Sequence, residues 1–160
     1  MTRTLVLGFG NPDRQDDGVA WHVLHTLAVR LRLPAPSTFE DEFPPNDRLE
    51  MAFHLQLTPE LAEDLACCGR VCFVDAHTGN VPAPVQLVRI QAGFQHSPFT
   101  HHLTPQSLLS MCQSLYGNAP QAALLSVRGY RFEFERSLSA ETAALLPQAI
   151  DLLLKWVEEE

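Results

Sequence analysis

The sequence predicts an α/β fold, a single three-layer domain in which a mainly parallel, twisted sheet of about five strands is flanked by helices. Short runs of β-branched and apolar residues alternate along the chain with segments whose apolar residues recur every three or four positions. This alternation is typical of βαβ units, whose sheets are covered on both faces. The length of 160 residues suits one compact domain, so we expect a single domain over residues 1–160.

The first elements are a strand and a helix joined by a glycine-rich loop. Residues 4–9 (TLVLGF) are apolar and end at glycines, which predicts a buried strand. The loop GNPDRQDDG leads into a helix, because valine and leucine recur every four residues from Val19 to Leu31. Residues 33–48 are rich in proline and acidic residues, which predicts a long surface connection with a short edge strand around Phe39.

A second strand and helix are predicted next. Alternate residues from Leu49 to Leu57 are apolar, which is the period of a half-buried strand. Thr58-Pro59-Glu60 has the composition of a helix start, with a capping residue, a proline and then an acid near the positive end of the helix. The side chains expected to face the core from this helix are Leu61, Leu65 and Cys68.

Three further strands are predicted in VCFVDA (71–76), VQLVRI (85–90) and AALLSV (122–127). Between the last two, Thr104-Pro105 repeats the helix-start signal and Gly117 is typical of a helix end. The side chains expected to face inward from this helix are Leu108, Met111, Cys112 and Leu115.

The closing part of the chain predicts an alternating segment and a last helix. YRFEFE (130–135) alternates in the manner of a strand. Ser139 begins a helical stretch, within which Pro147 should cause a kink or mark a second start.

Composition excludes several classes of function. The net charge is −8 and Lys155 is the only lysine, which opposes non-specific binding to nucleic acid or to an anionic membrane. No apolar run reaches the roughly 18 residues that span a bilayer, and no signal segment opens the chain. The four cysteines lack the Cys-x-x-Cys pairs of zinc sites, so we expect reduced, mostly packed cysteines in a cytoplasmic protein.

The glycine loop is the first candidate site, because ligands bind beyond the carboxyl ends of strands in such sheets. Gly8 and Gly10 begin a dinucleotide fingerprint, but Asp13 stands where that fingerprint needs its next glycine and would repel a pyrophosphate. The adjacent carboxylates of Asp16 and Asp17 suit a cation better. An aspartate before a glycine also caps helices, so one of the pair can cap while the other faces the cleft.

Two other segments offer metal-binding side chains. Asp75 ends a predicted buried strand and would share a sheet edge with the glycine loop, although it would also suit a turn cap. His101 and His102 lie in a loop before a predicted helix, as ligands or as exposed loop residues. Two carboxylates and one imidazole form an incomplete shell that suits nickel, zinc or cadmium. Neither a His-Glu-x-x-His helix nor a Gly-x-Ser-x-Gly elbow is present.

Four segments, in order, resemble the hydrogenase maturation proteases. LVLGFGNPDRQDDGVAWHVL resembles the opening strand, glycine loop, acidic pair and helix of that family. FVDAHTG is similar to its second acidic motif, THHLTPQSLL to its histidine motif, and RGYRFEFERSLS to its closing segment. Pro12-Asp13 and Arg136 depart from the family pattern, which has an apolar pair and a glycine at these places.

The resemblance implies roles for three residues. Asp17, Asp75 and His101 correspond to the metal-contacting residues of the family and would also be its catalytic group, with His102 as the rival to His101. Members remove a short C-terminal extension from the large-subunit precursor of nickel-iron hydrogenase after nickel has been inserted. We therefore expect a hydrogenase maturation endopeptidase with that precursor as its partner, with no nucleic-acid or membrane partner and no organic cofactor.

The resemblance also implies that nickel arrives with the substrate and serves its recognition. Cleavage itself could use the metal as a Lewis acid or a carboxylate as a general base, so the enzyme would be a metal-assisted or an aspartyl-type endopeptidase. The alternatives are a non-catalytic nickel carrier, a precursor-binding chaperone, and a peptidase acting on another protein.

Overall fold

The computed structural model of the protein describes residues 3–93 and 102–159, and contains one five-stranded sheet in the order β2-β1-β3-β5-β4. The strands are β1 (Thr4–Phe9), β2 (Glu50–His54), β3 (Arg70–His77), β4 (Val85–Ile90) and β5 (Gln121–Arg128). Neighbouring strands are parallel, except for the antiparallel pair of β4 and β5. The predicted α/β fold with a mainly parallel sheet is confirmed.

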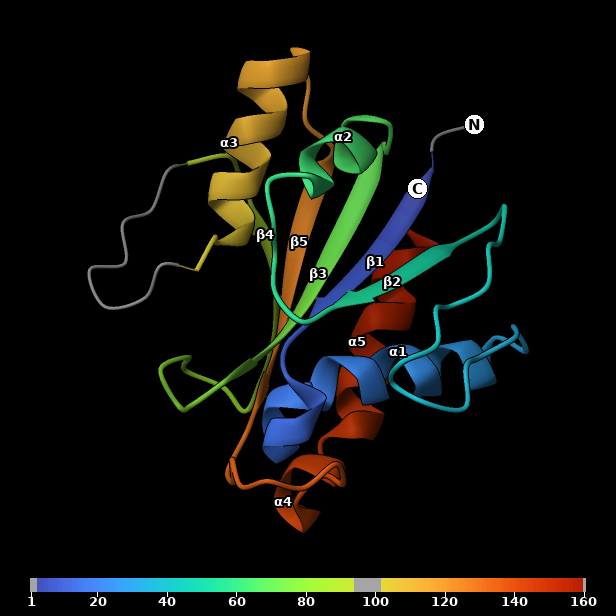
Figure 1. Cartoon of the computed structure of the whole chain (residues 1–160), viewed down its shortest axis with the longest axis vertical. Helices are drawn as coiled ribbons and strands as arrows, with labels where there is room; N and C mark the ends of the chain where they lie inside the picture. The colour runs from blue at the N-terminus through green and yellow to red at the C-terminus, as the bar shows by residue number, and fades with distance from the viewer. Residues whose placement is uncertain (1–2, 94–101, 160) are drawn as a thin grey trace.

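Helices cover both faces of this sheet. They are the 3-10 helix η1 (Pro12–Gly18) and the α-helices α1 (Val19–Arg30), α2 (Leu61–Ala66), α3 (Pro105–Tyr116), α4 (Ala140–Ala143) and α5 (Leu146–Glu158). Figure 1 shows α1 and α5 on one side of the sheet and α2 and α3 on the other. Within the described ranges, no helix combines the length and the apolar character that a membrane crossing requires.

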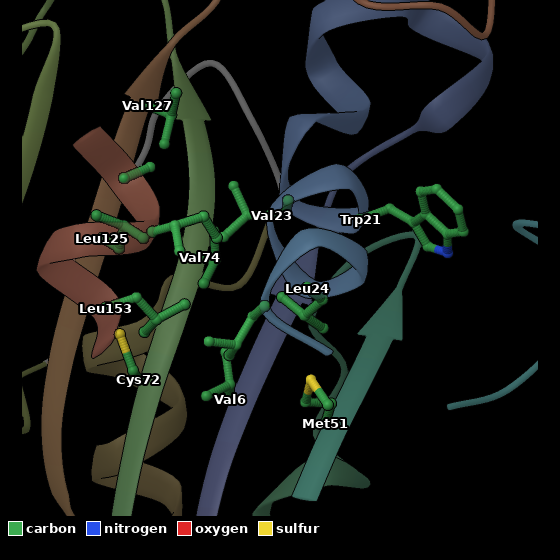
Figure 2. Packing of buried hydrophobic residues seen from close by; sticks show 14 of the residues in the cluster. Val6, Trp21, Val23, Leu24, Met51, Cys72, Val74, Leu125, Val127 and Leu153 are labelled. Carbon is green, nitrogen blue, oxygen red and sulfur yellow. The ribbon is translucent and has the colours of Figure 1, made fainter. Parts of the chain in front are cut away.

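The alternation of side chains along each strand creates two hydrophobic cores. Val6, Cys72 and Leu125 point toward α1 and α5 (Figure 2). Leu7 and Phe73 point the other way, toward α2 and α3. Burial of a leucine or phenylalanine side chain contributes about 1.5–3 kcal/mol, so both layers hold the sheet firmly and fix the edge at which its strands end.

Several predicted signals at helix ends are confirmed. The Thr104 side chain caps α3 by accepting a hydrogen bond from the Ser107 N–H at 3.1 Å. Gly117 ends that helix in the left-handed conformation, with φ of +78°. Pro147 lies in the first turn of α5 and therefore marks a second start.

Three local predictions are wrong for identifiable reasons. Phe39 lies in a turn rather than in an edge strand, with its ring centroid 4.5 Å from that of Trp21. Thr58 does not cap α2, because its carbonyl oxygen accepts from the Leu61 N–H in a turn that precedes the helix. The alternating residues 130–135 form a loop rather than a strand, because the backbone N–H groups of Tyr130 and Arg131 donate to the Asp16 side chain.

The cysteines are unpaired, as predicted. Cys68, Cys72 and Cys112 are buried, whereas Cys67 is exposed. Burial raises the pKa of Cys68 to about 11 and that of Cys72 to about 12, so both pack as uncharged thiols. Leu115 differs from its prediction, because 67% of it is exposed rather than turned inward.

The turn after β1 requires a glycine at position 10. Gly10 has φ of +145°, and a Cβ atom there would lie 2.0 Å from the Asp17 carbonyl oxygen. We predict that Gly10→Ala lowers the free energy of unfolding by about 3 kcal/mol or more, because conformational strain and a backbone clash add together.

Gly117→Ala is the matched control for this prediction. Gly117 also has a positive φ, but nothing lies within 4 Å of the added methyl group, so only the conformational cost of about 1–2 kcal/mol applies. Urea denaturation measures both variants. Equal losses would show that the close approach of Gly10 to Asp17 is not a constraint.

Candidate active site

The carboxyl ends of β1 and β3 place the two predicted carboxylates at one edge of the sheet. These strands are parallel neighbours, with Gly8 opposite Val74, so Asp75 lies beside the end of β1. The chain then turns at Gly10, whose N–H donates to the His54 carbonyl oxygen at 3.0 Å. Figure 1 shows the segment after β1 and the loop of residues 129–139 together at the lower end of the sheet.

Asp17 is held in place through one of its carboxylate oxygens. Its Oδ2 accepts a hydrogen bond from the Asn11 N–H at 2.8 Å. Among the described residues its Oδ1 has no hydrogen-bond partner, and the residue is only partly buried. Asp17 therefore has a fixed position and an oxygen that remains available for a ligand.

Asp75 has an altered protonation equilibrium. Burial at the end of β3 and, to a smaller extent, the charge of Asp17 together raise the pKa of its carboxyl group to about 7, while the hydrogen bond from the Ala76 N–H offsets part of their effect. Because the charge of Asp17 affects the pKa of Asp75, the two carboxylates lie close enough to repel each other. Near neutral pH, Asp75 is thus divided between its protonated and ionised forms, which suits a proton acceptor or donor.

An open cleft of about 470 Å³ lies beside Asp17. The residues that line it are Asn11, Arg14, Asp17, Leu55, Gln56, Thr78, His102 and Phe132. His102 is exposed and shares the cleft with Asp17. The predicted ligand His101 lies outside the described residues. Among residues 3–93 and 102–159, no three His, Cys, Asp or Glu side chains form a group that could hold a metal ion.

Asp16 has a structural role that differs from that of its neighbour Asp17. Its side chain is fully buried and accepts hydrogen bonds from the backbone N–H groups of Tyr130 and Arg131, each at 2.9 Å. Both the N–H and the hydroxyl group of Ser139 also donate to it, at 2.8 and 2.6 Å. Asp16 therefore anchors the closing loop to the loop after β1.

The environment of Asp16 stabilises its charged form. Burial by itself would raise the pKa of Asp16, but the hydrogen bonds from Ser139, Tyr130 and Arg131 outweigh it and hold the pKa below the usual value. From the sequence, one aspartate of the adjacent pair Asp16 and Asp17 was expected to cap a helix. The structure instead makes Asp16 a long-range acceptor, whereas the cap of η1 is the side chain of Asn11, which accepts from the Asp13 N–H at 2.9 Å.

Two residues that depart from the family pattern pair with each other. The Arg136 Nε atom lies 2.7 Å from a carboxylate oxygen of Asp13, and its Nη2 atom lies 2.7 Å from Glu40. Both contacts are exposed and contribute little to stability. Their consequence is geometric, because they join the glycine loop, the closing loop and the connection over residues 33–48.

His77 is occupied within the protein. Its Nδ1 accepts from the Gly79 N–H at 3.0 Å, so the ring proton lies on Nε2, which is 3.2 Å from the Pro84 carbonyl oxygen. Both ring nitrogens therefore shape the turn after β3, and His77 is not free to act as a ligand.

The fold is similar to that of several solved structures. No protein-family model matches the chain, and no curated protein matches it. The hydrogenase maturating endopeptidase HybD from E. coli is similar in structure, with a TM-score of 0.69, 20% identity, and coverage of 97% of this chain and 91% of that one. The hydrogenase 2 maturation peptidase from a Thaumarchaeota archaeon has a TM-score of 0.63, 19% identity and 99% coverage of both chains.

A third structure has the same arrangement. The [NiFe] hydrogenase maturation protease HycI from Thermococcus kodakarensis has a TM-score of 0.61 and 19% identity, and the likeness covers 99% of this chain and 94% of that one. The resemblance inferred from four sequence motifs is thus confirmed at the level of the fold, over nearly the whole chain.

Several residues that line the cleft are not indicated by any sequence motif. Leu55 was assigned to a strand, but it lies beyond the end of β2 and 63% of it is exposed. Arg14 and Phe132 come from loops more than a hundred positions apart. The only sequence feature that could have indicated them is their position, because Arg14 follows β1 and Phe132 follows β5, both at the carboxyl edge of the sheet.

We predict that variants of the adjacent residues Asp16 and Asp17 differ in their effect on stability. Asp16→Asn should lower the free energy of unfolding by about 2–4 kcal/mol, because an amide presents its NH₂ group to donors that need an acceptor. Asp17→Asn keeps an oxygen for the Asn11 N–H and should change stability by less than about 1 kcal/mol. Urea denaturation with circular dichroism compares the two, and a small loss for Asp16→Asn would contradict the anchoring role.

A second prediction concerns pH. The pKa of Asp75 is about 7 in the folded protein against 3.8 for an unperturbed carboxyl group, so the folded state binds this proton more tightly than the unfolded state. The contribution of Asp75 to stability therefore falls as pH rises from about 4 to about 7. Asp75→Asn removes this loss. The difference between the free energies of unfolding of Asp75→Asn and of the wild type should therefore shift in favour of the variant by up to about 1.4 kcal/mol per pH unit between pH 5 and 7.

Urea denaturation at four pH values from 5 to 8 measures this advantage. The same series in an Asp17→Asn background is the control, because removal of the neighbouring charge should move the plateau to lower pH. An advantage that does not vary with pH would rule out the raised pKa.

Proposed function

We propose that this protein is a hydrogenase maturation endopeptidase that removes the C-terminal extension of a nickel-loaded large-subunit precursor of nickel-iron hydrogenase. The observation that carries the proposal is the convergence of Asp17 and Asp75 at the carboxyl edge of a sheet whose fold is shared with maturation endopeptidases. The open cleft beside Asp17 supports it, because an extended polypeptide needs such an accessible groove.

In this proposal the nickel belongs to the substrate. Asp17, Asp75 and His101 would contact the nickel of the precursor, with His102 as the other candidate imidazole. The Oδ1 atom of Asp17, which has no hydrogen-bond partner in the described part of the chain, supports this role, as does the exposure of His102 in the same cleft. A precursor without nickel would offer these groups nothing to bind, so the contact would separate loaded from empty substrate.

Hydrolysis requires a group that accepts a proton from water and a group that returns one to the leaving amine. Asp75 suits this exchange when it is not bound to the nickel, because its pKa of about 7 in the metal-free protein lets it gain and lose a proton near neutral pH. Water would add to the scissile carbonyl carbon as Asp75 takes its proton, and the C–N bond would break as the nitrogen is protonated. Polarisation of the carbonyl by the substrate nickel is the other route.

The expected outcome of the direct test is the loss of a short peptide from the loaded precursor only. The protein is incubated with nickel-loaded and with nickel-free precursor, and the mass of each is followed by mass spectrometry. Asp17→Ala and Asp75→Ala should reduce the cleavage rate by at least about a hundredfold. Asp47→Ala, which removes an exposed carboxylate from the 33–48 connection, should cut at the normal rate.

Two further variants distinguish the candidate histidines. His101→Ala should abolish cleavage while His102→Ala retains it, and the reverse result would transfer the role to His102. An unchanged mass in both precursor samples would support a nickel carrier or a precursor-binding chaperone instead. Loss of the peptide from the nickel-free precursor would contradict nickel-based recognition.

A further inference from the structure

The cleft beside Asp17 contains a guanidinium group, that of Arg14, which has no carboxylate partner among the described residues. Arg14 is exposed and lines the cleft. The ion pairs of the described residues use Arg3 and Arg136, and none of them uses Arg14. Most arginines of the described residues also lack an ion pair, so Arg14 is distinguished by its location. It is the only arginine or lysine among the described residues that line the cleft.

The side chain of Arg14 is nevertheless held in position. Its Nε atom donates to the Phe132 carbonyl oxygen at 3.3 Å, and its Cζ atom lies 5.6 Å from the centre of the Phe134 ring. Among the described residues, these contacts leave its two Nη atoms without hydrogen-bond partners. A planar fork that is already oriented loses less conformational entropy when it binds a carboxylate.

Arg136 provides a comparison within the same loops. It binds carboxylates of Asp13 and Glu40, which neutralise its charge. Arg14 is the neighbour of Asp13 in sequence, yet Asp13 pairs with Arg136 instead. The loop around η1 therefore satisfies one arginine internally and presents the other to the cleft.

We propose that Arg14 binds a carboxylate of the C-terminal extension and so orients the substrate across the cleft. This inference rests on the proposed function, in which the extension is the segment that leaves. Every C-terminal segment ends in a carboxylate, and some also carry acidic side chains. Asp17 and Asp75 repel such a group and Arg14 attracts it, so the charges favour one direction of the polypeptide.

The test measures binding and cleavage separately. Kd for the nickel-loaded precursor is measured by fluorescence anisotropy, and kcat and KM are measured by mass spectrometry. The variants are Arg14→Gln and Arg14→Lys. Arg30→Gln is the matched control, because it removes one exposed positive charge from α1, away from the cleft. Each is assayed with three precursors: unaltered, with an amidated C-terminus, and with the acidic side chains of the extension changed to amides.

Arg14→Gln should raise Kd and KM about tenfold and leave kcat within about twofold, because the contact is equally present in the ground state and the transition state. Arg14→Lys should fall between this variant and the wild type, since lysine keeps the charge but loses the bidentate geometry. Arg30→Gln should match the wild type. One altered precursor lacks the carboxylate that Arg14 binds, and this precursor should have the same Kd for the wild type and for Arg14→Gln. The result shows whether the bound carboxylate is the C-terminus or an acidic side chain.

Two results would overturn the inference: equal effects of Arg14→Gln and Arg30→Gln, or a loss in Arg14→Gln that persists with both altered precursors. Failure of the wild type to bind the precursor at all would overturn it as well. If the wild type binds in an Arg14-dependent manner but does not cut, the docking role of Arg14 stands and the endopeptidase function fails.

Discussion

The buried carboxylate of Asp16 is the interaction on which the site depends. Its oxygens accept hydrogen bonds from Tyr130, Arg131 and Ser139, so one side chain joins the loop after β1 to the segment after β5. An unpaired charge at full burial would be strongly unfavourable. Because Asp16 is directed inward, the next residue, Asp17, can lie on the cleft side of the same loop.

The local backbone around these carboxylates is strained, and the surrounding contacts hold it in place. Gln15 has φ of +53°, which is unusual for a residue with a side chain, and its N–H donates to the Glu135 carbonyl oxygen at 2.8 Å. Asp75 is partly buried with a raised pKa beside a second carboxylate. Backbone strain and the repulsion between Asp17 and Asp75 thus both occur at one edge of the sheet. Burial of apolar side chains in the two cores offsets their unfavourable free energy.

The two departures from the family pattern have a common explanation in this structure. Asp13 and Arg136 are far apart in sequence and bind each other, and Arg136 extends the contact to Glu40 in the 33–48 connection. Each alone is an unexplained charge in a loop. Together they form one exposed cluster at the rim of the site, and they leave Arg14 as the arginine that faces the cleft.

Local apolar periodicity predicts the strands of the sheet and the longer helices, and the rule that parallel strands end at one edge predicts where Asp17 and Asp75 lie. Long-range contacts, in contrast, determine which aspartate of the adjacent pair is buried. That choice depends on donors from Tyr130 and Ser139, more than a hundred residues away, which no local pattern encodes. The loop of residues 130–135 shows the same limit, since its alternation suggests a strand until Asp16 takes its backbone N–H groups.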